Sequence, residues 1–400
     1  MSESTKKLRE PDFTLSAGPT MSSTRVQQAQ GRPIIFDYDP VFQEIFRETE
    51  RMAGELMRTD KDVILMQGEA VLGLEAAARG VVRPGMKCLN LVSGVYAKWF
   101  GDWLRSYEAE VVEIEVPFDQ AIEPGSVREM LEQHGDFELV SLVHSETPSA
   151  IENPLAEIGP IAKEAGALVF ADVVSAVGGT DVRPDEWGVD ICIGGPQKCL
   201  AGPPGMSMVA VGDDAWAAIE ANPNAPRGSF LSLLDWRQTW IEGGRVKFPY
   251  TPSVSDIFGV HAALSECLEE GLDDVIARHA AAAAACRAGV EALGLELWAR
   301  DSSYAANCVT GVRCPEGVTI SQTLAHVREN YGVMLSGGYG EISDKLFRLT
   351  HMGPISRSLY PLVSVSALGR GLRDLGVSVD LGAGAEAVLE SLAQVPTKAD

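Results

Sequence analysis

ICIGGPQKC, residues 191–199, is an apolar run that ends in small residues and a single lysine, Lys198. Earlier in the chain, ALVFADVVS, residues 167–175, contains a second apolar run, which ends in an acid, Asp172. Both runs have the pattern of buried strands, so the lysine and the acid come at the ends of two successive strands. A lysine amine condenses with an aldehyde, and a carboxylate keeps a pyridine nitrogen protonated, as a ring of the pyridoxal type requires. The pair therefore predicts a transaminase-like enzyme with Lys198 and Asp172 as its catalytic residues.

Strand-like and helix-like segments alternate along the chain from about residue 62. Such alternation is typical of an α/β fold with a mostly parallel sheet that helices cover on both faces. Ligands of these sheets bind at the carboxyl ends of the strands, where Asp172 and Lys198 fall. The predicted strands cover residues 62–66, 87–92, 111–116, 139–144, 167–172, 190–194 and 206–211, and helices cover residues 71–79, 97–107, 126–133 and 155–165.

The last part of the chain is predicted to form a smaller, separate C-terminal α/β domain. We expect an N-terminal segment over residues 1–30, a large domain over residues 31–275 and a small domain over residues 276–400. An alanine run at residues 280–285 favours a helix that leads into the small domain. Near the start of the chain, residues 13–20 are expected to form a short strand that runs into a Gly-Pro turn. Further strands are expected over residues 295–299, 308–313, 333–335 and 346–350, and further helices over residues 255–271, 273–293, 321–331, 361–375 and 385–393, with a helical face from Phe42 to Leu56.

Composition excludes several classes of partner. The formal net charge is −23, so binding to nucleic acid or to an anionic membrane surface is not expected. Seven cysteines are scattered without CxxC pairs or histidine partners, which predicts free thiols in a reducing compartment and no metal site. The start of the chain has no apolar signal-peptide region, and no apolar run is long enough to cross a membrane, so we expect a cytoplasmic protein.

Two residues have the right type and place to pack on the faces of a bound ring. Tyr96 follows a strand in a turn of small residues, and an aromatic side chain there stacks on a ring. Val174, two residues after Asp172, is expected to pack on the opposite face. The alternatives are structural: a buried tyrosine at a helix start, a core valine, a helix-capping Asp172 and a solvated Lys198.

Arg348 is unusual because it lies inside an apolar strand, Leu346-Phe347-Arg348-Leu349. A planar, bidentate donor in such a strand usually holds a carboxylate. We expect that carboxylate to belong to the substrate, and the alternative is a structural ion pair with a protein acid. The neighbouring His351 is expected to be a core histidine.

Three motifs resemble the class V aminotransferases, whose fold is the large type I pyridoxal-phosphate fold, and the resemblance covers nearly the whole chain. Ser16-Ala17-Gly18-Pro19 is similar to the family's N-terminal turn, which implies that Gly18 helps to bind the substrate carboxylate. Gly195-Pro196-Gln197-Lys198 is similar to its catalytic lysine motif. Phe248-Pro249-Tyr250-Thr251-Pro252 is similar to the segment that reaches into the neighbouring subunit's site, which implies a homodimer or homotetramer with shared active sites.

The segment QGEAVLGLE, residues 67–75, departs from the family pattern. Other members have a loop like Ser-Gly-Thr-Gly here, whose amides and hydroxyls hold the cofactor phosphate at a helix N-terminus. Glu69 falls at the serine position and Val71 at the threonine position. A carboxylate about 4 Å from a phosphate charge, at an effective dielectric of ~20, is repelled by roughly 4 kcal/mol. The segment therefore favours a ring with a neutral hydroxymethyl arm, and the alternative is a Glu69 that simply faces solvent.

Within the family, five segments resemble a subgroup that treats free pyridoxamine as a substrate; they cover residues 37–40, 68–77, 93–96, 195–199 and 350–354. This resemblance implies an amino transfer from pyridoxamine to pyruvate that gives pyridoxal and L-alanine in vitamin B6 degradation. It implies that pyridoxal forms an aldimine with Lys198, that Glu69 holds the hydroxymethyl arm and that Arg348 holds the keto-acid carboxylate. Asp172 would pair with the ring nitrogen and Tyr96 would stack on the ring.

The chain also departs from the subgroup, because Tyr339 stands in a glycine-rich turn where an arginine is expected. A tyrosine hydrogen-bonds a carboxylate but does not pair with it as a cation, so another keto acid is an alternative to pyruvate. Gln197 and Tyr250 are residue types that bind phosphate, which keeps open a pyridoxal 5′-phosphate-dependent alanine– or serine–glyoxylate aminotransferase. Two further alternatives are a cysteine desulfurase-like lyase that uses Cys199 or Cys308 and a catalytically silent relative.

Overall fold

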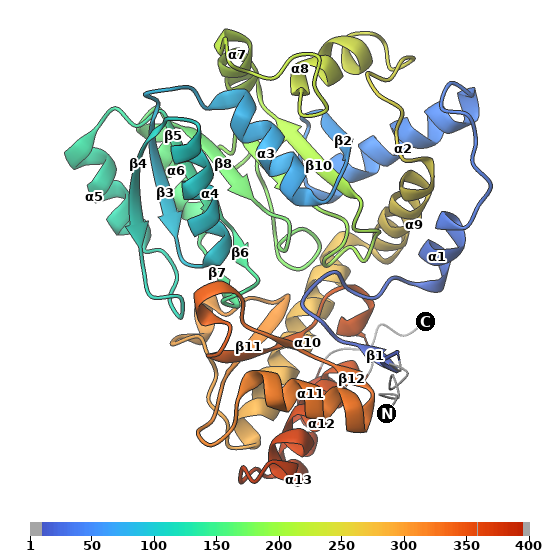
Figure 1. Cartoon of the computed structure of the whole chain (residues 1–400), viewed down its shortest axis with the longest axis vertical. Helices are drawn as coiled ribbons and strands as arrows, with labels where there is room; N and C mark the ends of the chain where they lie inside the picture. Colours follow the sequence, from blue (N-terminus) through green and yellow to red (C-terminus); the bar gives the residue numbers. More distant parts are fainter. Residues whose placement is uncertain (1–9, 358, 395–400) are drawn as a thin grey trace, which may run out of the picture.

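The computed structural model of the chain describes residues 10–357 and 359–394. A large α/β body contains a seven-stranded sheet, and a smaller α/β region built mainly from the C-terminal third lies below it in Figure 1. The predicted fold class, a mostly parallel sheet covered by helices with a smaller α/β part, is confirmed.

The large sheet has the strand order β2-β10-β9-β8-β5-β3-β4. All neighbouring strands pair in parallel except β10, which runs antiparallel to β9 and β2. Each predicted strand of this sheet is present within one or two residues of its expected bounds. The strands are β2 (Val63–Gln67), β3 (Lys87–Val92), β4 (Glu110–Glu115), β5 (Leu139–Val143), β8 (Leu168–Asp172), β9 (Ile191–Gly194) and β10 (Met206–Val211).

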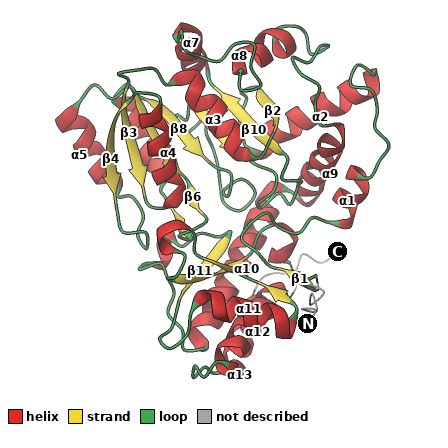
Figure 2. Ribbon diagram, viewed as in Figure 1, coloured by secondary structure: helices red, strands yellow, loops and turns green. Residues whose placement is uncertain are grey.

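Figure 2 shows α3 (Ala70–Val81) and α4 (Val95–Ser106) lying across this sheet. Both start directly after a strand, so their N-termini lie at the carboxyl ends of β2 and β3. A short hairpin of β6 (Ser145–Glu146) and β7 (Ile151–Glu152) follows β5. The other helices of this part are α1 (Thr24–Gln30), α2 (Pro40–Leu56), α5 (Pro124–His134), α6 (Leu155–Glu164), α7 (Asp213–Ala221), α8 (Leu233–Trp236), a π-helical turn (Arg237–Ile241) and α9 (Val254–Glu270).

The smaller region contains a three-stranded antiparallel sheet of order β11-β14-β13. Its helices pack against that sheet and against one another around a second apolar core. The strands are β11 (Val309–Arg313), β12 (Val333–Met334), β13 (Ser336–Gly337) and β14 (Leu346–Thr350), and the helices are α10 (Leu272–Ala292), α11 (Ile320–Tyr331), α12 (Tyr360–Asp374) and α13 (Leu381–Ala393), with 3₁₀ turns Ser302–Tyr304, Gly340–Ile342 and Gly353–Ser356.

The short strand and turn expected over residues 13–20 are both present. The strand is β1 (Phe13–Thr14), which pairs in parallel with β12. The turn follows it, and Gly18 there has a φ of 93°, a backbone conformation that favours glycine. One strand prediction was wrong, because residues 295–299 form one isolated bridge, between Leu297 and Val312, rather than a strand.

Two separate apolar cores lie on either side of α10. The larger core collects buried side chains from Phe42 to Val275, and the smaller one collects side chains from Ala285 to Val388. Leu15, near the start of the chain, packs into the smaller core. The N-terminal segment therefore runs along both parts, because α1 places Val26 against Ala262 and Ala263 of α9. The domain limits at residues 30 and 275 stay a prediction.

In the part of the chain that the structure describes, no helix is both long enough and apolar enough to cross a membrane.

Candidate active site

A cavity of about 310 Å3 opens where the carboxyl ends of the large sheet meet the smaller region. It brings together residues from segments that are far apart in the chain, including Gly18 near the start and Tyr339 near the end. Most of the predicted site residues line it: Gly18, Glu69, Tyr96, Asp172, Val174, Gln197, Lys198 and Tyr339.

Lys198 lies in the turn that follows β9, with 7% of its surface exposed. Its Nζ donates a hydrogen bond to the carbonyl of Ala17 at 3.0 Å. A Cβ atom at Gly18 would lie 2.6 Å from that Nζ, so only glycine leaves room for the lysine. Burial lowers the pKa of Lys198, which increases the fraction of neutral, nucleophilic amine. Lys198 is buried, and among the described residues no carboxylate pairs with it. This argues against the alternative that Lys198 is a solvated surface residue.

Asp172 is the last residue of β8, beside β9 and the turn that carries Lys198. Its Oδ1 accepts a hydrogen bond from the amide of Val174 at 2.9 Å, so it also has the local capping role weighed above. Among the described residues, no donor hydrogen-bonds to its Oδ2. Burial raises the pKa of Asp172 to about 6. A cation in the cavity, such as a protonated ring nitrogen, would favour the ionised carboxylate and lower that pKa.

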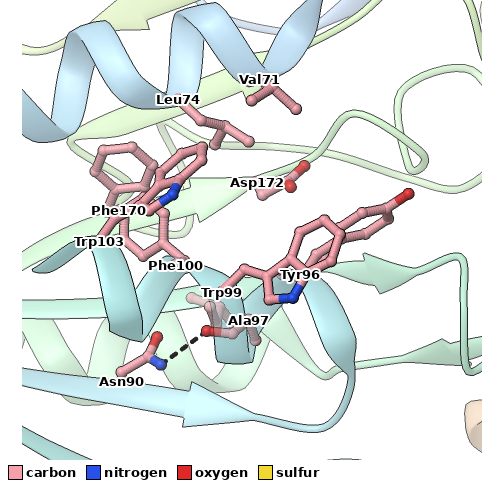
Figure 3. A pocket seen from close by; sticks show the side chains of 12 residues that line it. Val71, Leu74, Asn90, Tyr96, Ala97, Trp99, Phe100, Trp103, Phe170 and Asp172 are labelled. Atoms are coloured by element: carbon pink, nitrogen blue, oxygen red, sulfur yellow. Dashed lines mark hydrogen bonds between the residues drawn. The ribbon is translucent and has the colours of Figure 1, made fainter. Parts of the chain in front are cut away.

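Tyr96 and Val174 both line the cavity, from α4 and from the turn after β8. Figure 3 shows the Tyr96 side chain near that of Asp172, and both line the cavity. The ring is held edge-on to the Trp99 ring, with centroids 5.8 Å apart. Burial raises the pKa of the Tyr96 hydroxyl to about 12, so this aromatic side chain stays neutral. A flat, neutral face next to Asp172 suits the predicted stacking role.

Glu69 is the N-cap residue of α3. Its Oε2 accepts a hydrogen bond from the Val71 amide at 2.9 Å, and its Oε1 accepts one from Gln197 Nε2 at 2.6 Å. The carboxylate thus lies where an anion would bind the helix N-terminus. It is exposed in the single chain, but both oxygens are engaged by the protein, unlike a side chain that simply faces solvent.

Gln197 is 2% exposed, and its Oε1 is buried without a hydrogen-bond partner. Since its amide nitrogen is used by Glu69, the vacant oxygen is free to accept a hydrogen bond from a ligand hydroxyl. This unpaired acceptor fits a pyridine ring that carries a hydroxyl group, with or without a phosphate.

Arg348 lies next to the cavity rather than among the residues that line it. Its guanidinium donates to the carbonyls of Gly337 and, at 3.3 Å, Thr147. Among the described residues no carboxylate pairs with it, which argues against the structural ion pair. Burial lowers the pKa of Arg348. A half-buried cation without a counter-ion favours the predicted role, which remains a prediction.

Tyr339 lines the cavity and is 47% exposed. Its ring lies edge-on to Trp99, with centroids 5.3 Å apart, so the two rings form one side of the cavity mouth. Trp99 was not selected by sequence reasoning. A tryptophan on the exposed face of an amphipathic helix gives no signal until the smaller region places Tyr339 beside it.

Tyr250 and Thr251 do not reach the cavity of their own chain. Tyr250 donates a hydrogen bond to Asp235 at 2.6 Å, and its ring lies 5.3 Å from that of Phe230. Thr251 is exposed. The resemblance assigns this segment to the neighbouring subunit's site, and that assignment stays a prediction.

Glu146 is a second residue that the sequence did not reveal. It is fully buried, and its Oε1 accepts a hydrogen bond from the Ala97 amide at 2.7 Å. The N-cap residue of α4 is Gly94, which has no side chain, and a Cβ there would lie 2.5 Å from Glu146 Cδ. Glu146 therefore caps α4 from the β6–β7 hairpin and fixes the helix turn that carries Tyr96.

The structure bears on two further predictions, the core role of His351 and the alternative of a desulfurase cysteine. His351 is fully buried and pairs with Thr310 at 2.8 Å, as expected of a core histidine. Cys199 and Cys308 are buried, and burial raises the pKa of both thiols. A sulfur-accepting cysteine needs an accessible thiolate, so neither thiol is suited to desulfurase chemistry. No cluster of metal-ligating side chains occurs within residues 10–357 and 359–394.

Comparison with known proteins agrees with this geometry. The sequence model of the aminotransferase class-V family matches residues 29–357. The chain is 43% identical over 380 residues to a pyridoxamine–pyruvate transaminase of Mesorhizobium japonicum, covering 95% of this chain and 96% of the relative. It is 28% identical to a serine–glyoxylate aminotransferase of Methylorubrum extorquens, covering 95% of each chain.

The fold is similar to solved structures of the same group. The crystal structure of pyridoxamine–pyruvate aminotransferase from Mesorhizobium loti superposes with a TM-score of 0.93 and 42% sequence identity. The match covers 96% of this chain and 98% of that one.

The cap on α4 gives a testable pH dependence. Burial raises the pKa of Glu146 to about 8, against 4.5 ordinarily, so the folded state binds the extra proton. Its contribution to stability is therefore complete below pH 4.5 and is lost as the pH rises through about 8, by at most ~1.4 kcal/mol per pH unit. We expect Glu146→Gln to gain thermal stability relative to the wild type between pH 5.5 and pH 8.

The measurement is the Tm of both proteins, without ligand, across that pH range. Glu157→Gln, in the first turn of α6, serves as the matched surface control and should leave the difference in Tm constant. A difference for Glu146→Gln that does not change with pH would contradict the assignment.

Proposed function

This chain belongs to the class V aminotransferases, and from that premise we propose that it moves the amino group of free pyridoxamine to pyruvate, giving pyridoxal and L-alanine. The observation that carries the substrate assignment is the pairing of Glu69 with the N-terminus of α3, the position that would otherwise hold a phosphate. The 43% identity to a pyridoxamine–pyruvate transaminase supports the same assignment. Such a reaction belongs to vitamin B6 degradation.

The proposed transfer balances without any outside oxidant. The aminomethyl carbon of pyridoxamine is oxidised to the aldehyde of pyridoxal, and the keto carbon of pyruvate is reduced to the Cα of alanine. The amino group moves from pyridoxamine to pyruvate, and the carbonyl oxygen lost by pyruvate is matched by the one gained by pyridoxal. One proton moves between the two carbons. When bound, the pyridine ring supplies the electron sink for this proton transfer.

In this proposal Lys198 is the general acid and base. Its buried Nζ has one hydrogen bond, to Ala17, and is otherwise available to accept or donate a proton. Asp172 Oδ2 would accept a hydrogen bond from the protonated ring nitrogen. Burial raises the pKa of the Asp172 carboxyl, and the positive charge of that nitrogen would favour its ionised form. Tyr96 and Val174 would keep the ring planar between them, and Glu146 positions Tyr96 through α4.

The 5′ arm of the ring decides between the two main readings. A hydroxymethyl group donates a hydrogen bond to Glu69 or to the unpaired oxygen of Gln197. A phosphate would meet a carboxylate there and would compete with it for the Val71 amide. The runner-up, a pyridoxal-phosphate-dependent alanine– or serine–glyoxylate aminotransferase, needs Gln197 and a neighbouring subunit's Tyr250 segment to outweigh that repulsion.

We propose a homodimer or homotetramer in the cytoplasm as the working form. Two apolar side chains that are close in sequence, Ile34 and Phe36, are 74% and 71% exposed. Exposed apolar residues of this kind are typical of a contact between subunits. In such an oligomer the segment around Tyr250 would complete the active site of the neighbouring subunit. In the described residues all seven cysteines are free thiols, which suits a reducing compartment.

The central test is a titration of dialysed protein with pyridoxal and, separately, with pyridoxal phosphate. The readout is the visible absorbance that appears when either aldehyde condenses with Lys198. We expect saturation by pyridoxal at a concentration at least tenfold lower than by the phosphorylated ring. Preferential uptake of pyridoxal phosphate, or protein that arrives already carrying it, would overturn the proposal in favour of the glyoxylate enzymes.

Neutralising Glu69 should relax the exclusion of phosphate. A single like-charge pair near 4 Å at ~20 effective dielectric costs roughly 4 kcal/mol, and the exposure of Glu69 reduces this to an expected gain of about tenfold in pyridoxal-phosphate affinity. Glu69→Gln keeps the side-chain shape, and affinity is read from the same absorbance titration. Glu75→Gln, on α3 and paired with Arg79, is the matched control and should change neither affinity.

Replacing Arg348 should separate keto-acid binding from ring binding. Losing a charged hydrogen-bond donor costs about 1.5–3 kcal/mol, so Arg348→Ala is expected to raise the KM for pyruvate by roughly tenfold to a hundredfold. Pyridoxal affinity should change less than about threefold, and Arg348→Lys should recover part of the loss. Equal losses in both measurements would show that Arg348 only supports the Gly337 and Thr147 carbonyls.

A further inference from the structure

A second cavity, of about 120 Å3, adjoins the active site behind Asp172. Side chains from α3, α4, β3, β5 and β8 enclose it. Figure 3 shows those of α3, α4, β3 and β8 that it labels. Three rings form an aromatic wall: Phe100, Phe170 and Trp103. The Phe100 ring centroid lies 4.7 Å from that of Phe170 and 6.2 Å from that of Trp103. We call this space the α4 cavity.

The α4 cavity is almost entirely apolar. Aliphatic and aromatic side chains make up most of its lining residues, and its one amide side chain belongs to Asn90. Asn90 is already satisfied, because its Nδ2 donates to the Ala97 carbonyl at 2.9 Å and its Oδ1 accepts from Ser141 at 2.8 Å. Apart from Asp172 and the Tyr96 hydroxyl, the lining has no polar side chain that lacks a partner, so a hydrocarbon group is the occupant that this lining favours.

The position of the cavity relates it to the ring proposed above. Asp172 is one of the residues that line both spaces, whereas Lys198 lines only the active site. Phe170 and Asp172 are alternate residues of β8, so both side chains lie on the same face of the sheet. In a pyridine ring held at N1 by Asp172 and at the opposite carbon by Lys198, the N1 edge is therefore the edge next to the α4 cavity.

We propose that the α4 cavity is a subsite for an alkyl group on ring carbon C2, and that the enzyme accepts pyridoxamine-type rings whose C2 substituent is larger than methyl. This inference rests on the proposed function, because it uses the ring orientation assigned there. Carbon C2 adjoins N1 on the side away from the hydroxymethyl arm and Glu69. A longer alkyl chain at C2 would pass Asp172 and enter the space between Phe100 and Leu142.

The volume sets the size of the group. An apolar cavity of about 150 Å3 stays dry and holds a benzene molecule, so 120 Å3 has room for a chain of about two or three carbons. Each added methylene that leaves water for such a surface is worth ~0.8 kcal/mol, which corresponds to roughly fourfold in affinity. Ethyl and propyl groups are therefore expected to bind more tightly than methyl, and a long chain is not.

The experiment uses pyridoxine and its 2-ethyl and 2-propyl homologues, which lack the aldehyde and report on binding alone. Calorimetric titration of the full chain should give a dissociation constant that falls about fourfold for each added carbon. A 6-methyl pyridoxine is the positional control, because C6 also adjoins N1. A 2-ethyl homologue that binds tenfold more weakly than pyridoxine, or a 6-methyl ring that alone gains affinity, would overturn the proposal.

Two variants test the location. Ala97→Leu fills the α4 cavity and should lower the ratio of 2-propyl to 2-methyl affinity to one or below. Trp103→Leu enlarges the cavity at a half-buried position and should raise that ratio. The ratio is the readout because general damage weakens both ligands equally, and unchanged ratios in both variants would place the alkyl group elsewhere.

This design separates the two proposals. If pyridoxine and pyridoxal both fail to bind while pyridoxal phosphate binds, the proposed function fails. If pyridoxine binds and its longer homologues do not, the subsite alone fails.

Discussion

The parallel pairing of β8 with β9 is the constraint on which the active site depends. Asp172 lies opposite Ile193 in this pair, and the Val173 amide donates to the Ile193 carbonyl at 2.9 Å just beyond it. Both strands are buried and both end at the same edge of the sheet, so their next residues enter one cavity. A carboxylate and an amine thereby line one space that suits a pyridine ring, and the described residues show no hydrogen bond or ion pair between them. The sheet provides the rigidity that loops alone would not provide.

Two helix N-termini meet this cavity, and a carboxyl group from the protein occupies each. Glu69 caps α3 from its own N-cap position, and Glu146 caps α4 from a distant hairpin. Helix N-termini attract anions, and a terminus whose amides already bind a protein oxygen has fewer amides left for an external one. At α3 this changes which ring the site favours, since the phosphate position is filled. At α4 it holds the turn that carries Tyr96, and the apolar space behind that turn remains open to hydrocarbon.

Sequence reasoning succeeded where a local pattern carried the information. The apolar runs of β3 and β10 gave their bounds without error, because a buried strand is a continuous apolar segment with abrupt ends. It was wrong for residues 295–299, whose apolar residues are buried by contact with other segments and form only one isolated bridge, between Leu297 and Val312. Glu146 was missed for a related reason: a cap supplied from another element leaves no trace around the helix that it caps. The roles of Arg348, Tyr250 and Thr251 stay predictions.

The sequence by itself determined the class of fold, the lysine and aspartate pair and the unusual acid at position 69, because each is written in residues close together in the chain. Only the tertiary structure decided that Glu69 is tied to Gln197, that Tyr339 lies beside Trp99, and that an apolar cavity lies behind Asp172. These features depend on how α3, α4 and the C-terminal region pack over the ends of the strands. Packing of that kind is set by the shapes of many side chains at once, which no local pattern encodes.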